Sequence, residues 1–288
     1  MFIADDWQDY EVLDTGHGEK LERWRDIILR RPDPQVIWPP TLNEQRWNQC
    51  AAHYHRSSSG GGCWQFNSKL PERWTISYGK SCRFYIRPTN FKHTGLFPEQ
   101  AVNWRWIMEK IAGANRPISV LNLFAYTGGA TVAAAAAGAD VCHVDAAKGM
   151  VQWAKENIQL SGLEHRTVRF ITDDVFKFVA REQRRGRKYD AIIMDPPSFG
   201  RGPGGETWKL EASLYDFTAS CLHVLSDNPL FFLINSYTTG LSASVLKNIM
   251  TMTIGKNRGG KVVADEIGLP VTASGLVLPA GASARWEA

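Results

Sequence analysis

The spacing of apolar and polar positions changes near Gln100. Beyond it, a helical spacing of apolar residues over 102–112 is followed by short apolar runs that alternate with amphipathic segments. The runs predict strands at 119–124, 140–145, 167–172, 189–194 and 229–235, and the segments predict helices at 129–137, 148–160, 175–183 and 211–225. Strands and helices that alternate in this way form a parallel sheet with helices on both faces. The sequence therefore predicts an α/β protein.

The first 91 residues follow another pattern. Strand-like runs at 26–31, 74–78 and 83–87 are separated by Gly and Pro, and six of the eleven Trp residues lie in this part. This pattern predicts a small, mostly β N-terminal domain over 1–91 and a larger α/β domain over 92–288.

The last part of the chain carries two further strand patterns. They cover 261–265 and 276–286, and the second is broken at 279–281 by Pro, Ala and Gly. We expect them to close the large sheet as an antiparallel pair.

Composition narrows the class of protein without identifying it. Apolar residues make up 44% and charged residues 22%, which is ordinary globular usage. The longest apolar run is too short to cross a membrane, and the acidic start of the chain lacks a signal-peptide pattern. We therefore expect a cytoplasmic protein without a membrane partner.

Cysteine and histidine spacing does not indicate a metal site. The five Cys are odd in number and widely spaced, and no C-x-x-C motif occurs. His53, His55 and Cys63 are near one another in the sequence but lack a fourth ligand at a usual spacing. We predict neither a disulfide framework nor a bound metal.

The net charge of +4 is unevenly distributed. Residues 46–92 hold eight Lys and Arg against the single acid Glu72, and they are interleaved with Trp47, Trp64, Phe66, Trp74, Phe84 and Tyr85. Basic charge with aromatic rings is suited to RNA. The alternative is that these rings form the core of the β domain.

A second basic cluster lies near the end of a predicted helix. Its members are Arg181, Arg184, Arg185, Arg187 and Lys188. Positive charge gathered in this way attracts phosphate. The alternative is a solvated helix end.

Ligands of open α/β sheets bind beyond the carboxyl ends of the strands. The first loop at such an end is Asn122-Leu123-Phe124-Ala125-Tyr126-Thr127-Gly128-Gly129. Its two Gly allow a tight turn and a close approach of a ligand, and a helix N-terminus follows. The G-x-G-x-x-G fingerprint of dinucleotide binders is absent, which argues against a pyrophosphate-bearing cofactor.

The next two loops are acidic. Asp145 ends the predicted strand 140–145, where a carboxylate can accept hydrogen bonds from both hydroxyls of a ribose. The alternative for Asp145 is a helix N-cap. Asp173 and Asp174 follow the next strand, where an acid can accept a hydrogen bond from an exocyclic amine; the alternative is two solvated acids at a helix start.

The fourth loop is Asp195-Pro196-Pro197-Ser198-Phe199. Two consecutive Pro restrict the backbone and cannot continue a strand ladder. They hold the Asp195 carboxylate and nearby carbonyls beside the Phe199 ring. This loop is suited to clamping a planar target that carries an amine, and we predict that Asp195, Pro196, Pro197 and Phe199 form the catalytic loop.

Together these loops resemble class I S-adenosylmethionine (SAM)-dependent methyltransferases. The usual first motif is acid-x-Gly-x-Gly-x-Gly, and its positions are taken here by Asn122, Phe124, Tyr126 and Gly128. The N-x-F-x-Y-T-G-G form resembles the branch that contains the large-subunit ribosomal RNA methyltransferases of the cytosine-C5 and guanine-N7 types.

A second segment resembles the same branch. Residues 92–100 are similar to its K-x-T-G-x-F-x-D-Q segment, with Glu99 in place of the usual Asp. The resemblance covers roughly residues 75–240. It implies a Rossmann-like sheet and SAM as the cofactor, with Phe97 and Gln100 covering it.

The resemblance also implies roles for the strand-end residues. Asp145, with Ala146 beside it, would hold the ribose of SAM. Asp174 aligns with the family's G-D-A-F pattern and, with Val175, would meet the adenine. The remaining cofactor contacts would come from Asn122, Phe124, Tyr126, Thr127, Gly128 and Asp195.

A cysteine nucleophile distinguishes covalent cytosine-C5 methylation from direct transfer to nitrogen or oxygen. Transfer of the activated methyl group of SAM needs positioning and sometimes a base. Enzymes of the cytosine branch also carry a Cys nucleophile after the strand that here ends at Asn235, and no Cys follows it in 236–238. We therefore predict methylation of RNA, with ribosomal RNA favoured, at a nitrogen or oxygen. A small-molecule or protein methyltransferase and an NAD-binding protein remain alternatives.

Overall fold

The computed structural model describes residues 1–57, 61–201, 207–238 and 240–288. The chain divides into two compact units. The large unit contains Met1–Phe2, Asn103–Ile267 and Ala280–Ala288, and the small unit contains Ile3–Val102 and Gly268–Pro279. Residues 92–102 therefore pack as part of the small unit. The functional boundary expected after Phe91 stays a prediction.

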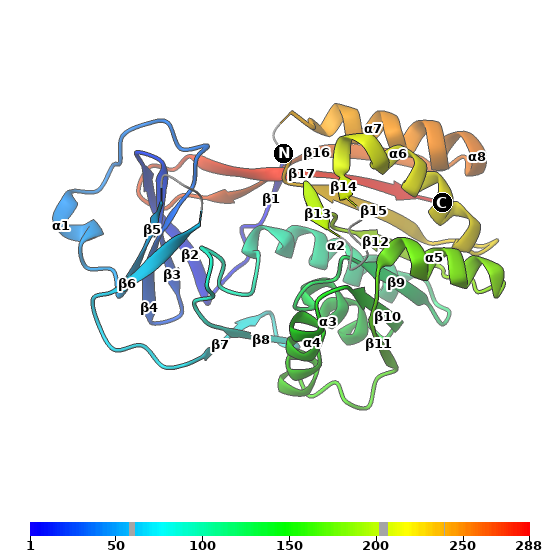
Figure 1. Ribbon diagram of the computed structural model, residues 1–288, viewed down its shortest axis with the longest axis horizontal. Helices are drawn as coiled ribbons and strands as arrows, with labels where there is room; N and C mark the ends of the chain where they lie inside the picture. The colour runs from blue at the N-terminus through cyan, green and yellow to red at the C-terminus, as the bar shows by residue number, and fades with distance from the viewer. Residues whose placement is uncertain (58–60, 202–206, 239) are drawn as a thin grey trace. The chain divides into compact units, whose positions relative to one another are not determined.

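The large unit is built on an eight-stranded sheet with the order β1-β16-β17-β15-β12-β9-β10-β11 (Figure 1). Its parallel strands are β9 (Ser119–Leu123), β10 (Asp140–Asp145), β11 (Val168–Thr172), β12 (Ala191–Met194) and β15 (Phe231–Ser236). The predicted α/β fold is confirmed. The chain order along the sheet reverses between β9 and β12, and a ligand crevice is expected at the carboxyl ends of such strands.

The C-terminal strand completes this sheet in the opposite direction. β17 (Val277–Glu287) pairs antiparallel with β15, and β16 (Lys261–Pro270) and β1 (Phe2–Ile3) follow it in the sheet. The antiparallel addition of the last strand is confirmed, but the break predicted at 279–281 is wrong. A Cβ on Gly281 would lie 2.8 Å from the carbonyl oxygen of Ser236. The glycine therefore permits close pairing with β15 rather than ending the strand.

Helices cover both faces of the sheet (Figure 1). One group consists of α2 (Ala101–Gly113), α3 (Gly129–Ala136) and α4 (Lys148–Leu160), and the other of α5 (Val175–Arg184), α6 (Leu210–Cys221) and α7 (Ala243–Met250). The helix predicted over 211–225 is shorter than expected, because a 3-10 turn at Leu222–Val224 follows α6. The sequence pattern assigned no element between 235 and 261, where α7 continues through a π-helical turn, Thr251–Gly255, into α8 (Lys256–Arg258).

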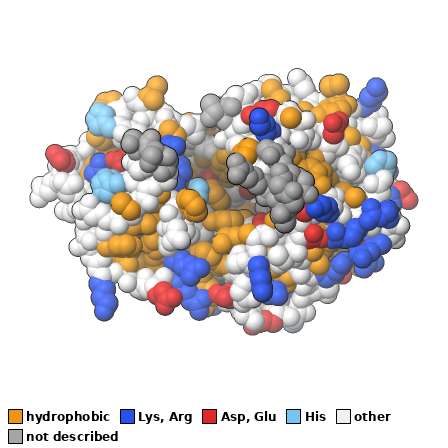
Figure 2. All heavy atoms as spheres, in the orientation of Figure 1, with side chains coloured by type: hydrophobic (Ala, Val, Ile, Leu, Met, Phe, Trp, Pro, Cys, Tyr) orange, Lys and Arg blue, Asp and Glu red, His pale blue; other side chains and the backbone are white. Residues whose placement is uncertain are grey.

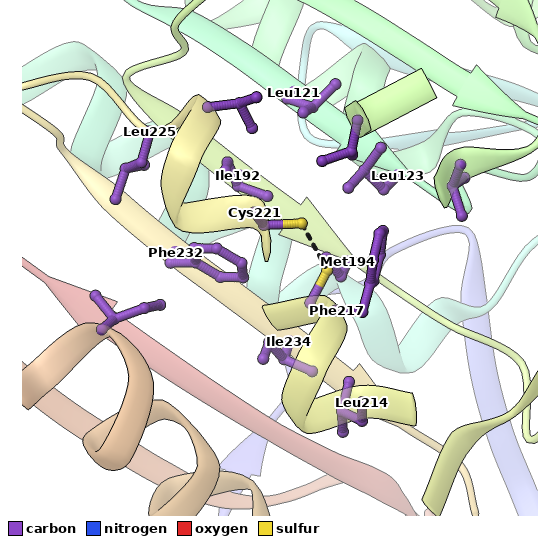
Figure 3. Close-up of a cluster of buried hydrophobic side chains, with 14 of the residues drawn as sticks. Leu121, Leu123, Ile192, Met194, Leu214, Phe217, Cys221, Leu225, Phe232 and Ile234 are labelled. Carbon is purple, nitrogen blue, oxygen red and sulfur yellow. Dashed lines mark hydrogen bonds between the residues drawn. The ribbon is translucent and has the colours of Figure 1, made fainter. Parts of the chain in front are cut away.

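The core of the large unit follows the two-residue period of its strands. Alternate side chains of four neighbouring strands face α5 and α6, among them Leu121, Leu123, Ile192, Met194, Phe232 and Ile234 (Figure 3). All six are completely buried. Burial of one such side chain stabilises the fold by roughly 1.5–3 kcal/mol. The same face also receives Phe217 and Cys221 from α6.

The small unit is mostly β, as predicted. Its five-stranded sheet has the order β2 (Tyr10–Gly16), β3 (Glu19–Trp24), β4 (Ile27–Pro32), β5 (Ala52–Arg56) and β6 (Gly62–Phe66). A separate hairpin is formed by β7 (Trp74–Tyr78) and β8 (Cys82–Ile86), and two short helices are α1 (Glu44–Trp47) and a 3-10 turn at Pro98–Gln100.

Neither a membrane span nor a metal cluster is present among the residues that the structure describes. None of their helices combines the length and apolar character that crossing a bilayer requires. No three of their His, Cys, Asp or Glu side chains are placed to share a metal ion. The cytoplasmic location stays a prediction.

Candidate active site

The loops predicted from the sequence share one edge of the large sheet. Backbone hydrogen bonds continue past the last strand residues: Ala125 N–H donates to Val144 O at 3.1 Å, and Asp173 N–H donates to Asp145 O at 3.0 Å. On the other side of β9, Asp195 N–H donates to Leu123 O at 3.4 Å. The turn after β9 and the loops after β10, β11 and β12 are therefore neighbours, at the switch point of the sheet.

The turn after β9 has an unusual backbone. Phe124 and Tyr126 have φ of 56° and 50°, and Gly128 has φ of 84°. The left-handed region costs a non-glycine residue roughly 1–2 kcal/mol. These are the positions of the family's glycine motif, so the chain keeps the backbone shape of a glycine turn with two aromatic residues in it.

The Phe124 side chain is held by other aromatic rings. Its centroid lies 5.8 Å from Trp208, 6.0 Å from Phe217 and 6.4 Å from Phe176. Aromatic pairs of this kind contribute about 0.5–1.5 kcal/mol each beyond burial. This packing offsets the strain at Phe124.

The glycines of the turn are required by close packing. A Cβ on Gly128 would lie 2.9 Å from the Cβ of Ala154, and one on Gly129 would lie 2.6 Å from Cζ2 of Trp104. In addition, Asn157 Nδ2 donates a hydrogen bond to Thr127 O at 2.8 Å. Helices α2 and α4 therefore fix the turn. The sequence reasoning missed Asn157, although a polar residue on the apolar face of a helix is a signal that could have found it.

Asn122 precedes the turn, and its side-chain amide is buried and hydrogen-bonded within the protein. Its Nδ2 donates to Thr131 Oγ1 at 2.9 Å, and Thr131 Oγ1 lies 2.9 Å from His143 Nδ1. Burial lowers the pKa of His143 to about 3, so the imidazole stays neutral. These buried hydrogen bonds connect β9 and β10 to α3. The cofactor contact expected of Asn122 stays a prediction.

Asp145 is held by backbone groups. Its Oδ2 accepts from Tyr126 N–H and its Oδ1 from Ala147 N–H, both at 2.8 Å. Burial raises the pKa of Asp145, and the two backbone hydrogen bonds offset part of this effect. The alternative that Asp145 caps the next helix is wrong, because the N-cap of α4 is Ala147. A carboxylate has about four acceptor positions, so those left over fit the two hydroxyls of a ribose.

The two acids after β11 have separate partners. Asp174 is the N-cap of α5, with Oδ1 accepting from Lys177 N–H at 2.9 Å. Asp173 forms an ion pair with Arg181. The helix-start alternative is thus confirmed for Asp174, while Asp173 is paired rather than merely solvated. The adenine contact expected of Asp174 and the buried Val175 stays a prediction.

The loop after β12 is anchored at two points. Trp208 Nε1 donates to Pro197 O at 2.6 Å, and Thr238 Oγ1 donates to Ser198 Oγ at 2.6 Å. The loop leads into a hairpin of β13 (Phe199–Arg201) and β14 (Thr207–Lys209). Phe199 leaves 51% of its surface exposed. Trp208 therefore connects the predicted target loop with the aromatic cluster around Phe124. The spacing of residues in the sequence did not indicate this role.

Thiols are absent from the described residues that follow β15, namely 237, 238 and 240–242. Cys221 lies inside α6, completely buried and 3.9 Å from Met194 Sδ, and burial raises its pKa. Burial also raises the pKa of Cys142 on β10. Neither is suited to act as a thiolate nucleophile at this site.

Two of the expected cofactor residues belong to the small unit. Phe97 is half-buried and precedes the 3-10 turn, and Gln100 is buried in it. Their covering role stays a prediction.

Comparisons with known proteins give the family and the fold of this chain. The family model described as S-adenosylmethionine-dependent methyltransferase matches residues 6–210. A crystal structure of the SAM-dependent methyltransferase from Agrobacterium tumefaciens is 38% identical, with a TM-score of 0.93 over 99% of this chain and 93% of that one. A putative SAM-dependent methyltransferase from Streptococcus mutans shares the fold at 19% identity, with a TM-score of 0.76 over 98% and 76% of the two chains.

Curated relatives are similar over shorter stretches. Ribosomal RNA large subunit methyltransferase K/L from Shewanella frigidimarina is 30% identical over 210 residues, which are 72% of this chain and 27% of that protein. Ribosomal RNA large subunit methyltransferase K from Neisseria meningitidis is 36% identical over 118 residues, or 41% and 32% of the two chains. This chain thus spans about a third or less of these two relatives. The family match and the Agrobacterium structure cover most of it, and the chain belongs to the S-adenosylmethionine-dependent methyltransferase family.

Proposed function

We propose that this enzyme transfers the methyl group of SAM to RNA, at a nitrogen or oxygen atom. The main support for SAM binding is the position of Asp145. Its carboxylate is held by two backbone N–H groups at the switch point of the sheet, with acceptor positions left for a ribose. Family membership sets aside the NAD-binding alternative.

The strand-end loops supply the other cofactor contacts in this proposal. The turn over Tyr126, Thr127 and Gly128 lines the methionine part, and its left-handed backbone brings main-chain atoms to the ligand. Asp174 and Val175 border the adenine. SAM supplies an activated methyl group on a sulfonium, so the protein's task is to position the acceptor and exclude water.

The loop after β12 holds the target base. The exposed ring of Phe199 offers a stacking surface, and Pro196 and Pro197 restrict the backbone beside it. Asp195 accepts a hydrogen bond from an amine or hydroxyl of the base. The anchors from Trp208 and Thr238 keep this loop in position without touching the target.

Among the described residues around the proposed site, no thiol is suited to nucleophilic attack, which favours nitrogen or oxygen as the acceptor atom. Methylation of a pyrimidine at C5 needs a thiolate that attacks the ring first. The two cysteines placed on β10 and α6 are buried, and burial raises the pKa of both. Transfer to a ring nitrogen, an exocyclic amine or a hydroxyl needs no covalent intermediate.

RNA is supported by the names of the relatives and by one surface of the small unit. The curated relatives are ribosomal RNA methyltransferases. Of the aromatic residues in 46–92, Trp47 and Phe84 are core. Phe66 is 56% exposed, and its ring stacks on Trp64 with centroids 6.5 Å apart. This pair offers the base-stacking surface that single-stranded RNA needs.

Methyl transfer from radiolabelled SAM tests the proposal. The protein is incubated with ribosomal subunits and total RNA from a strain that lacks it, and with protein and metabolite fractions. We expect label in RNA, and nucleoside analysis should place it on nitrogen or oxygen. An Asp195→Asn variant should lose transfer, whereas Asp216→Asn, an exposed acid on α6, should keep it. Label in protein or metabolites alone, or on cytosine C5, would contradict the proposal.

A further inference from the structure

A group of exposed cations lies at the far end of α5. We call Arg169, Arg184, Arg185, Arg187 and Lys188 the basic cluster. Its members come from β11, from α5 and from the segment that follows α5. In Figure 2, blue side chains gather in this region of the large unit.

A buried carboxylate pairs with two members of the basic cluster. Glu182 is 1% exposed, and its Oε2 accepts from Tyr189 Oη at 2.6 Å. Arg185 Nη1 lies 3.1 Å from Glu182 Oε1, and Arg169 Nη1 lies 3.9 Å from Oε2. Two guanidinium groups from different elements therefore converge on one fixed point.

The side chains that carry these guanidinium groups remain accessible to solvent. The side chains of Arg185 and Arg169 are 61% and 42% exposed. A guanidinium carries five N–H donors in a planar fork, which matches the oxygens of a phosphate. The interaction of a helix C-terminus with cations explains Arg184 on its own, but not an arginine from the neighbouring strand.

The charge of the basic cluster is large for this chain. The five cations and Glu182 together carry a net charge of +4, and the net charge of the entire chain is also +4. Arg181 is not part of this excess, because it pairs with Asp173 near the start of α5. Concentrated positive charge of this kind attracts a polyanion.

The basic cluster is separated from the proposed active site by the length of α5. Asp174 caps the helix beside the site, and Arg184 is its last residue. Ten residues at a rise of 1.5 Å per residue make roughly 15 Å. A stacked strand that rises by 3.4 Å per nucleotide covers this distance in about four to five nucleotides.

We propose that the basic cluster binds the phosphate backbone of the RNA substrate, about four to five nucleotides from the methylated residue. The proposal rests on RNA as the substrate class, but backbone binding can be measured apart from methylation. The basic cluster is then a second RNA contact of the large unit, and its distance from the target loop determines which nucleotide of the strand is methylated.

The test compares two double variants. Arg184→Gln/Arg187→Gln removes two exposed members and leaves Glu182, Arg185 and Arg169 in place. Lys247→Gln/Lys256→Gln removes two exposed charges from α7 and α8 and is the matched control. Kd is measured by fluorescence anisotropy with a fluorescein-labelled RNA hairpin over a range of salt concentrations, and Kd for SAM is measured by calorimetry.

We expect the cluster variant to bind the hairpin about tenfold or more weakly at low salt. The slope of log Kd against log salt should fall by about one for each phosphate that the variant no longer neutralises. The control variant should match the wild type, and all three proteins should bind SAM equally. KM for RNA should rise in the cluster variant with kcat unchanged.

Three outcomes would overturn the proposal. One is equal hairpin binding by the cluster variant and the control. Another is an unchanged hairpin Kd with lost binding to vesicles of anionic lipid, which would assign the cluster to a different polyanion. The third is a cluster variant that loses SAM binding, which would indicate a role in folding. If the wild type binds the hairpin through the cluster but methylates no RNA, the proposed function fails and the binding surface stands.

Discussion

Glu22 of the small unit and Asp145 of the large unit hold their carboxylates in opposite ways. In the small unit, Glu22 is completely buried and accepts hydrogen bonds from Arg31 Nε at 2.6 Å and Nη2 at 2.8 Å. Burial alone would raise the pKa of Glu22, but Arg31 and Lys20 outweigh it and lower the pKa to about 2. Glu22 is therefore neutralised by a cation of its own unit.

In the large unit, Asp145 accepts hydrogen bonds from backbone N–H groups, and burial raises its pKa. None of the cations that the structure describes forms an ion pair with this carboxylate, and acceptor positions remain for a ligand. The contrast between these two residues teaches that Glu22, with its counter-charge inside the fold, serves stability, whereas Asp145, held by backbone groups at a strand end, is suited to binding.

The largest effect expected from this contrast is on Glu22. Glu22→Gln leaves the buried Arg31 without its counter-charge, so the free energy of unfolding should fall by about 3–5 kcal/mol. Urea denaturation followed by circular dichroism measures it. The control is Glu11→Gln, which removes a partly exposed pair with Arg23 and should cost less than about 1 kcal/mol. An equal fall in unfolding free energy in the two variants would contradict a larger stabilising role for the Glu22 pair.

The corresponding change at Asp145 should act on binding instead. Asp145→Asn removes the charged acceptor, so we expect Kd for SAM to rise by tens to about a hundredfold, the equivalent of about 1.5–3 kcal/mol. No buried cation is left unpaired, so the unfolding free energy should change by less than about 1 kcal/mol. Calorimetry and urea denaturation measure the two quantities. Asp140→Asn, at the exposed start of the same strand, is the control and should change neither.

A smaller effect is expected from the left-handed backbone of the turn at Phe124. At Phe124, both Ala and Gly lose the aromatic packing, but Gly also removes the left-handed strain. Phe124→Gly should therefore be more stable than Phe124→Ala by about 1 kcal/mol. At Phe217, inside α6, the order should reverse by a similar amount, because Gly is unfavourable in a helix. The same order at both positions in urea denaturation would contradict the strain at Phe124.

The smallest effect is on the pH dependence of SAM binding. Because the pKa of Asp145 is raised, protonation begins above the ordinary value of 3.8, and a protonated carboxyl offers fewer acceptors. Kd for SAM should therefore rise by up to about twofold as the pH falls to that pKa. The pKa of Glu22 is lowered from 4.5 to about 2, so its stabilisation is complete above 4.5 and is lost only between 4.5 and 2.

Calorimetry between pH 7 and 5, with circular dichroism at each pH, separates binding from unfolding. Asp145→Asn should remove the pH dependence. A wild-type Kd that does not change over this range would show that Asp145 stays ionised throughout it.

Local pattern predicted the regular parts of the fold well. The strands β9, β10 and β11 and the helices α3, α4 and α5 lie within a residue or two of the predicted ranges. It failed over 243–258, because the π-helical turn at Thr251–Gly255 shifts the apolar face and interrupts the 3.6-residue period. It also failed for the three-residue strands β13 and β14, which are too short to show a period.

The sequence by itself determined which segments form the sheet and which residues follow each strand, because burial repeats at fixed spacing along a strand or helix. The tertiary structure decided how those residues act. Phe124 is left-handed because rings from distant helices hold it, and Glu182 brings an arginine of β11 to the arginine that follows α5. Such contacts join residues far apart in the chain, and no local period encodes them. The Asn122-to-Gly129 turn shows both: its place was readable from the sequence, and its glycine-like shape was decided by packing.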